Sequence, residues 1–325
     1  MFTAVKSSAR GLAILGAIAA SALASVGGPP IPGSAAGRVF STSFESIGDF
    51  DGFYIVPQNH LGTASHEQST EQVRSGTYSH KGWIYGANPP PPPGGNTNHR
   101  GYPTVQLHKT PGGGFVCPCT VRFYAWLDMP LDDPGEWFSF ATLARSSSDS
   151  FWDAVLVNIA AANPAPGTVP GGVLHLMHVP SVGLREPTFQ TNTILFPMRQ
   201  WVKIEIYIDF DPVNGQAVVW QDGQMVSAAP VSGGNGKLEQ AHFGLYAAPS
   251  IASGVINNDD LEITEGVAGV GGIAELPEVA NVAALPHSAR ASGSEQLVLV
   301  GAAVLGLLTL AGGGWYSRRR RMWAN

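Results

Sequence analysis

The stretch from Trp201 to Val226, WVKIEIYIDFDPVNGQAVVWQDGQMV, carries the clearest fold signal in this chain. Apolar residues occupy every second position up to Phe210, and polar or charged residues lie between them. Side chains of a strand point to alternate faces of its sheet, so this period of two predicts a strand with one face in a core. The Asn214-Gly215 pair supplies the left-handed dihedrals of a tight turn, and Asp222-Gly223 is a second turn signal. The stretch therefore predicts consecutive antiparallel hairpins.

Strand-like runs of this kind recur on both sides of the hairpins, with no internal repeat of fixed period. Only 13% of the 325 residues are charged, whereas glycine occurs 40 times and proline 25 times, as expected for many short strands joined by tight turns. We predict one all-β domain at residues 38–265, built as an antiparallel β-sandwich or jelly roll. The runs cover residues 38–46, 78–86, 104–110, 119–129, 136–145, 152–161, 171–180, 241–248 and 258–265.

The first 24 residues have the pattern of a secretory signal peptide. Lys6 and Arg10 precede an apolar run, and Ala22-Leu23-Ala24 offers small residues for cleavage. Residues 25–37 are rich in Pro, Gly, Ala and Ser, which is typical of a flexible leader. We therefore expect the domain to be exported.

The C-terminal region is predicted to be an anchor. Residues 266–294 are typical of a stalk, and residues 295–317 are apolar and long enough for a transmembrane helix. The tail at 318–325 contains four consecutive arginines, and such clusters stay on the cytoplasmic side of a membrane. The domain is therefore expected on the outside.

The pentapeptide LPHSA at residues 285–289 precedes the predicted span. This order of pentapeptide, hydrophobic span and basic tail resembles the sorting signals of bacterial wall-anchored proteins. Those signals carry Thr and then Gly where this chain has Ser288 and Ala289. The resemblance implies attachment at a bacterial cell surface, by the membrane helix or by transfer to the wall.

The charge of the chain bears on its partners. The formal net charge is −6, and basic residues cluster only in the C-terminal tail, so no basic stripe is present to replace the counterions of a nucleic acid. A local arginine could still bind an acidic polymer. We expect a monomer that binds no nucleic acid.

Two cysteines, Cys117 and Cys119, are separated by one proline. A bridge across so short a loop would strain the usual disulfide geometry. Two free thiols are therefore favoured over a bridge or a metal pair.

The order of hairpins from residue 200 to the last run resembles the concanavalin A-like lectin and glucanase fold, especially its bacterial polysaccharide lyases. The resemblance covers most of residues 38–265 at the level of element order. In the alginate-lyase branch, a Gln-x-His strand, a Tyr-Phe-Lys-x-Gly-x-Tyr strand and an arginine strand line a groove. Gln106-Leu107-His108 matches the first, residues 242–246 match the second without its lysine and with altered spacing, and HRGYPT at 99–104 is loosely similar to the third.

Two polar rows are predicted in these segments. Strand alternation places Thr104, Gln106 and His108 on one face and directs Val105 and Leu107 to the core. The same alternation places His242 and Tyr246 on one face, together with a glycine at 244 that leaves room for a ligand. We expect a ligand to lie across both rows.

Lyases that act on uronic acids remove the proton beside the sugar carboxylate and then expel the glycosidic oxygen. They need a group that neutralises the carboxylate, a base and an acid. Arg100 and Gln106 suit the first task. His108 is the candidate base, because histidine titrates near neutral pH, and Tyr246 is the second proton-transfer group. This scheme requires no metal or other cofactor.

Further residues are predicted to contact a sugar without reacting. Tyr102, Trp126 and Trp220 could stack on sugar rings. His242 shares the face of Tyr246, and His178 could lie at the edge of the groove. His175 lies three residues before His178, so the two face opposite ways in a strand, which weakens a shared metal site.

Two functions remain open. The first is a cell-surface protein that recognises polysaccharide and cleaves uronic-acid polymers by β-elimination; the alternative is a non-catalytic carbohydrate-binding or adhesive module. A glycoside hydrolase is less favoured, because the Glu-x-Asp-x-x-Glu motif of related glucanases does not occur. A structural Ca²⁺ could be held by Glu45 with Asp259 or Asp260 if the first and last strands pair, since that ion prefers oxygen ligands.

Overall fold

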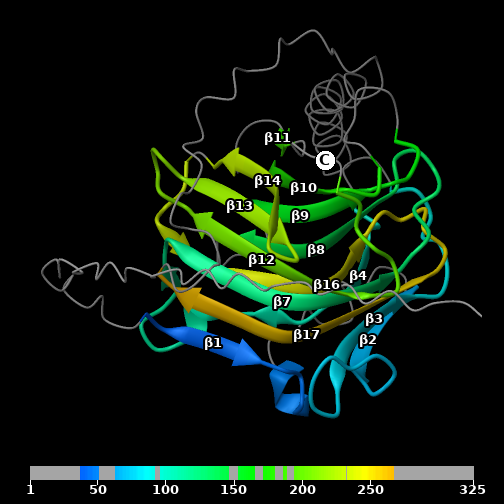
Figure 1. Ribbon diagram of the computed structural model, residues 1–325, viewed down its shortest axis with the longest axis horizontal. Coiled ribbons are helices and arrows are strands. Elements are labelled where there is room, and N and C mark those ends of the chain that lie inside the picture. The colour runs from blue at the N-terminus through cyan, green and yellow to red at the C-terminus, as the bar shows by residue number, and fades with distance from the viewer. Residues whose placement is uncertain are drawn as a thin grey trace, which may run out of the picture. The chain divides into compact units, whose positions relative to one another are not determined.

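The computed structural model describes residues 37–50, 63–91, 96–145, 153–164, 171–179, 186–188, 194–231 and 233–266. They form two antiparallel sheets packed face to face and a small third sheet (Figure 1). The prediction of an all-β antiparallel architecture is confirmed.

The eight-stranded sheet has the order β14-β13-β12-β7-β17-β3-β2, and β1 also pairs with β17. Every pairing in this sheet is antiparallel. Its strands are β1 (Val39–Thr42), β2 (Ala64–Ser69), β3 (Ser79–Ile84), β7 (Cys119–Asp128), β12 (Trp201–Asp209), β13 (Gln216–Gln221), β14 (Gln224–Pro230) and β17 (Gly254–Glu265).

The seven-stranded sheet has the order β11-β10-β9-β8-β16-β4, and β5 pairs with the other part of β16. A two-stranded sheet joins β6 (Phe115–Val116) to β15 (Lys237–Leu238). The strands of the seven-stranded sheet are β4 (His99–Gly101), β5 (Thr104–Val105), β8 (Trp137–Ala144), β9 (Ala154–Ala160), β10 (Leu174–Val179), β11 (Glu186–Thr188) and β16 (Gln240–Ala247).

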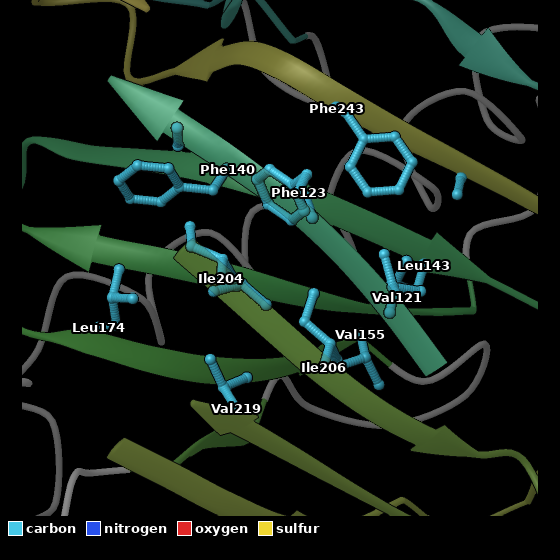
Figure 2. Packing of buried hydrophobic residues seen from close by; sticks show 14 of the residues in the cluster. Val121, Phe123, Phe140, Leu143, Val155, Leu174, Ile204, Ile206, Val219 and Phe243 are labelled. Carbon is cyan, nitrogen blue, oxygen red and sulfur yellow. The ribbon is translucent and has the colours of Figure 1, made fainter. Parts of the chain in front are cut away.

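Alternate residues of both sheets meet in one apolar core (Figure 2). Phe123 of β7 contacts Phe243 of β16 edge-on across the two sheets, with ring centroids 5.2 Å apart. Phe140 of β8 packs against Phe196 at 4.7 Å. Fully burying a side chain of this size contributes about 1.5–3 kcal/mol, so the interlocked faces hold the two sheets together.

The predicted alternation of β12 is confirmed, because Val202, Ile204, Ile206 and Ile208 are all buried in the core. The turn prediction after it is wrong. Neither Asn214 nor Gly215 has a positive φ in the structure; the Asp211 carboxylate instead accepts hydrogen bonds from the backbone of residues 213 and 214 in a longer loop.

The tight turn of this region is Asp222-Gly223, with φ values of 49° and 80°. Two residues with positive φ between paired strands form the turn that matches strand twist, and here they join β13 to β14. The second turn signal therefore marks the two-residue hairpin.

The first and last strands of the domain are neighbours. β1 pairs with β17 from Val39↔Thr264 to Thr42↔Leu261. Arg38 donates side-chain hydrogen bonds to both carboxylate oxygens of Glu265, at 3.0 Å and 2.9 Å, and to the carbonyls of Pro111, Gly113 and Gly114. This set of contacts, called the Arg38 clasp below, ties both ends of the domain to the segment before β7.

The predicted signal peptide, stalk, transmembrane helix and basic tail lie outside the described residues, apart from the last residue of the leader and the first of the stalk. Within the described segments, no helix is long and apolar enough to cross a membrane.

Candidate functional site

The outer face of the seven-stranded sheet, the face turned away from the core, carries an unusual set of polar side chains. On β9, Val155, Val157 and Ile159 belong to the core, so Leu156 and Asn158 point to the outer face. The same alternation assigns residues of β4, β8, β10 and β16 to this face. The outer face therefore gathers polar groups from several strands.

Five of these residues form one row across five strands. Arg100 of β4 is opposite Tyr246 of β16, which is opposite Ser139 of β8. Ser139 is in turn opposite Asn158 of β9, and Asn158 is opposite His175 of β10. Neighbouring strands lie about 4.8 Å apart, so the row spans about 19 Å. We call these five residues the polar row.

One end of the polar row combines a cation with a phenol. The Arg100 guanidinium carbon lies 5.8 Å from the centre of the Tyr246 ring, and the ring of Trp137 meets Tyr246 edge-on at 5.1 Å. Asn98 donates a hydrogen bond of 3.0 Å to the Tyr246 hydroxyl. Arg100 and Tyr246 are both partly exposed, so this end can be reached from solvent.

Tyr102 and His242 adjoin this end. Their rings stack at a centroid distance of 4.7 Å, and Tyr102 also meets Tyr246 edge-on at 6.2 Å. Burial and, to a smaller extent, the nearby positive charge of Arg100 lower the pKa of His242 to about 3. His242 is therefore a neutral imidazole near pH 7 and a weak base.

The other end of the polar row contains two buried polar side chains. Asn158 is 4% and His175 is 3% exposed. Within the described part of the chain, Asn158 Oδ1 and His175 Nδ1 have no hydrogen-bond partner. Burial lowers the pKa of His175 to about 4, although the Val173 backbone opposes the shift. This end is therefore uncharged near pH 7.

A histidine from the opposite sheet lies behind the row. The backbone of β16 is irregular between residues 243 and 246, and Gly244 has a φ of 131°. A Cβ atom added to Gly244 would lie 2.5 Å from Cε1 of His80. His80 is fully buried on β3, where its Nδ1 lies 3.1 Å from the Asn258 side-chain nitrogen. The missing side chain of Gly244 thus makes room for His80, and does not open space for a ligand.

The structure does not place Gln106 and His108 in a strand with Thr104. β5 ends at Val105, and residues 107–109 form a 3₁₀ turn. The His108 backbone N–H donates to the Glu239 carbonyl at 2.9 Å, and its ring Nδ1 lies 3.2 Å from the same oxygen. Glu239 precedes Tyr246 by seven residues along an extended chain, which corresponds to about 20 Å. His108 and Tyr246 therefore do not face one sugar together.

The structure brings Arg100, Tyr102, His242 and Tyr246 together, but two predicted tryptophans lie elsewhere. Trp126 is on β7 and Trp220 on β13, both in the eight-stranded sheet. Trp126 is opposite Trp201, and Trp220 is 6% exposed in a small cluster with Tyr207 and Val218 on the side away from the core. Neither belongs to the outer face of the seven-stranded sheet.

His178 also lies away from the row. Its partner across β9 is the core residue Val155, so it faces the inside of the sandwich, opposite to His175. Its Nε2 is 3.7 Å from the Asp153 carboxylate, and that carboxylate forms an ion pair with Arg145. His178 is thus part of a buried charged group at the strand ends.

The three acidic residues proposed for Ca²⁺ surround one loop. Glu45 accepts hydrogen bonds from the backbone of Thr77 and Tyr78, and Asp259 accepts them from the backbone of Arg74 and Ser75. Asp260 accepts from the hydroxyls of Ser43 and Ser75. Burial raises the pKa of the Asp259 carboxyl. Hydrogen bonds to residues 74–78 account for the positions of these carboxylates. Binding of Ca²⁺ remains a prediction.

Among the described residues, no group of three or more His, Cys, Asp or Glu side chains is arranged to hold a metal ion.

Sequence reasoning missed three members of the polar row, namely Ser139, Asn158 and His175. Asn158 is the one polar residue of β9, whereas Ser139 shares β8 with Thr142 and His175 shares β10 with His178. One or two polar residues in a mostly apolar strand were the available signal. Only the strand register, which places the three residues side by side, shows that they form one group.

No family model matches this sequence, and no curated protein matches it. Solved structures with a similar arrangement include an endo-β-1,4-glucuronan lyase from the fungus Trichoderma reesei, with 14% identity over 65% of this chain and 95% of that chain, at a TM-score of 0.41. The cellulose induced protein Cip1 has 15% identity over 68% of this chain and 97% of its own, at 0.45. An alginate lyase has 10% identity over 57% of this chain and 74% of its own, at 0.39. At these identities the likeness concerns the fold alone.

Proposed function

We propose that this domain recognises an extracellular uronic-acid polysaccharide along the outer face of the seven-stranded sheet. The single observation that carries the proposal is the polar row, with a guanidinium at one end and uncharged groups from Ser139 to His175. A guanidinium binds a carboxylate in a fixed geometry, whereas hydroxyl, amide and neutral imidazole groups bind sugar hydroxyls. Arg100 and Tyr246 are the partly exposed members of the row, whereas Ser139, Asn158 and His175 are at most 4% exposed, so a polymer would first bind at the Arg100 end.

The uncharged end supports a ligand rich in hydroxyl groups. A buried polar atom without a hydrogen bond costs about 1–3 kcal/mol, and both Asn158 and His175 present one. A bound water would remove this cost, as would a sugar hydroxyl that displaces it. The apolar side chains of Leu156 and Met177, opposite each other on the next register position, would contact the carbon face of a sugar ring.

We further propose that the domain acts outside a bacterial cell and is tethered to its surface. The support is the sequence at the two ends, where an apolar N-terminal run and an apolar C-terminal run followed by four arginines flank the domain. Protease treatment of intact cells should release the domain. If the chain resists protease until the cells are lysed, this location is rejected.

Binding of the full chain to alginate, glucuronan and a heparin-type polymer, with a neutral glucan as comparison, tests the proposed function. We expect one acidic polymer to bind and the neutral glucan to bind much more weakly. Arg100→Gln should reduce affinity at least tenfold, because a carboxylate then loses its charged partner. Arg199→Gln is the matched control, since Arg199 is an exposed arginine paired with Asp128 away from the row. Equal loss in both variants, or binding to no polymer, rejects the proposal.

Elimination is the second candidate function. The contact between Arg100 and Tyr246 favours it, because a proton-transfer group adjoins a cation that could neutralise a uronate. The neutral His242 is a weak base, and His108 is bonded to Glu239 far along the strand. The geometry therefore supports binding more strongly than cleavage.

Ultraviolet absorbance of unsaturated sugar during incubation distinguishes these functions, because elimination creates a conjugated double bond and binding does not. If absorbance rises, Tyr246→Phe should abolish it while the polymer still binds. His108→Ala should leave the rate within about twofold, given its distance from Tyr246. Full activity of Tyr246→Phe would remove Tyr246 from the reaction.

A further inference from the structure

The two cysteines are brought into contact by the turn that leads into β7. Cys117 Sγ and Cys119 Sγ lie 3.2 Å apart, and both residues are thiols in the structure. Cys117 is partly exposed, whereas Cys119 is buried in the core at the first position of β7. The pair therefore combines one partly exposed cysteine with one that is buried.

The two sulfurs differ in reactivity as well as in exposure. The hydrogen bond with Cys117 and burial raise the pKa of the Cys119 thiol, and the carboxylates of Glu265 and Asp209 add to the effect. The thiolate is the nucleophile in thiol chemistry, so Cys119 is a poor group to start a reaction. Cys117 is the sulfur that an external reagent would meet first.

We propose that Cys117 and Cys119 form a reversible disulfide by exchange with a small-molecule disulfide such as oxidised glutathione. The Cys117 thiolate attacks one sulfur of the reagent and forms a mixed disulfide, which releases one glutathione thiol. Cys119 Sγ then attacks Cys117 Sγ, and its proton ends on the departing glutathione sulfur, which leaves as the second thiol. Two protein thiols are oxidised and one external disulfide is reduced to two thiols.

The short spacing makes this bond easy to reopen. A ring that encloses a single intervening residue departs from the preferred disulfide geometry, and strained or exposed disulfides are the ones that thiols reduce readily. This disulfide would therefore open and close with the ratio of reduced to oxidised thiols in the surroundings, whereas an unstrained structural disulfide would stay closed.

Formation of the Cys117–Cys119 disulfide would change the backbone of residues 117–119, which joins three parts of the domain. The Cys117 N–H donates to the Gly236 carbonyl beside the β6–β15 pair, at 2.9 Å. The carbonyl of Pro118 accepts a hydrogen bond of 2.7 Å from Gly266 at the end of β17. A change of torsion at residues 117–119 should reach both bonds, so exchange of the Cys117 amide with deuterium should differ between the two redox forms.

The test uses the full chain, incubated with oxidised glutathione, denatured with an alkylating agent and weighed by mass spectrometry. We expect loss of two hydrogens, no alkylation, and return of two alkylatable thiols after treatment with reduced glutathione. Two alkylated thiols after oxidation, a persistent glutathione adduct in the unaltered chain, or a bond that reduced glutathione leaves intact would each overturn the proposal.

Two single variants test the order of attack. Cys119→Ser should stop at a glutathione adduct on Cys117, because no second sulfur is present to release it. Cys117→Ser should remain unmodified in the folded chain, because Cys119 is buried. Rapid modification of Cys119 in the folded Cys117→Ser chain would reject Cys117 as the entry point. If a variant fails to fold, the masses of the unaltered chain decide the proposal alone.

Discussion

Gly244 and His80 show how a single missing side chain positions residues from both sheets. The Cβ position of Gly244 is occupied by the edge of the His80 ring, and the carbonyl of Gly101 lies 3.1 Å from the same point. His242 and Tyr246 lie on either side of this glycine in β16. The contact between the sheets therefore helps to set where the two candidate site residues emerge.

Gly244→Ala should lower the free energy of unfolding by about 3 kcal/mol or more, because it adds a collision in a packed interior to a backbone conformation that side chains disfavour. Gly223→Ala is the matched control, since Gly223 also has a positive φ but has no heavy atom within 4 Å of the added Cβ. It should cost about 1–2 kcal/mol. Urea unfolding of both variants measures the difference, and equal losses would contradict a role for His80.

Buried neutral histidines make stability depend on pH. The pKa of His175 is lowered by burial to about 4, whereas histidine in an unfolded chain titrates near 6.5. Between these values the unfolded chain binds more protons than the folded one, so the free energy of unfolding should fall as pH falls from about 6.5 to about 4.

His175→Gln should remove part of this pH dependence, about 3 kcal/mol across the window, because glutamine does not titrate there. Asn158→Leu is the control, since it changes the neighbouring position without removing a titrating group. Denaturant unfolding at a series of pH values provides the measurement. An unchanged slope in His175→Gln would show that His175 is not the group responsible.

Among the elements, the segment after Thr104 shows the limit of an alternating pattern. Val105 and Leu107 are both buried, as the alternation predicts, yet the strand ends between them. The Thr110 hydroxyl donates to the Leu107 carbonyl, and the His108 N–H donates to Glu239, so the local hydrogen bonds close a turn. Over three or four residues, a strand and a 3₁₀ turn can bury the same positions, and only the partners of the backbone distinguish them.

The Arg38 clasp is an element-scale device whose contribution can be measured. Arg38 holds the pKa of the Glu265 carboxyl at about 2, and its hydrogen bonds to three carbonyls tie the two ends of the domain to the segment before β7. Arg38→Gln should lower the free energy of unfolding by about 1–3 kcal/mol, since charge-assisted hydrogen bonds are lost. Arg199→Gln, at an exposed ion pair, should cost at most about 1 kcal/mol. Similar costs for both would mean that the clasp adds little.

At the scale of the whole molecule, strand periodicity was sufficient to predict the class of fold but not the composition of the face. The apolar alternation of β12 is present in the structure because each apolar side chain on that face of the strand is buried in the core. The polar row depends on register between strands that are far apart in the chain, such as β4 and β16, and no local pattern encodes that register. This explains why Arg100 and Tyr246 were anticipated as partners through a resemblance, whereas Asn158 and His175 were not.

The row also predicts how affinity depends on polymer length. Asn158→Leu should weaken binding of long acidic chains, about fivefold to tenfold from loss of one hydrogen bond at the uncharged end. It should leave binding of a short oligosaccharide held at Arg100 unchanged, since that ligand does not reach Asn158. Calorimetric titration with a length series measures both. Equal weakening at all lengths would mean that the substitution disturbs the sheet and does not remove a local contact.

The pairing of β1 with β17 means that the chain enters and leaves the domain at one edge, where Glu265 N–H donates to the Arg38 carbonyl at 2.8 Å (Figure 1). A circular permutant that joins these ends through a short glycine linker and opens the chain between Asp222 and Gly223 should keep the same packing, because surface turns tolerate new termini. Its unfolding midpoint would report how far the stability of the domain depends on the order in which its strands are connected.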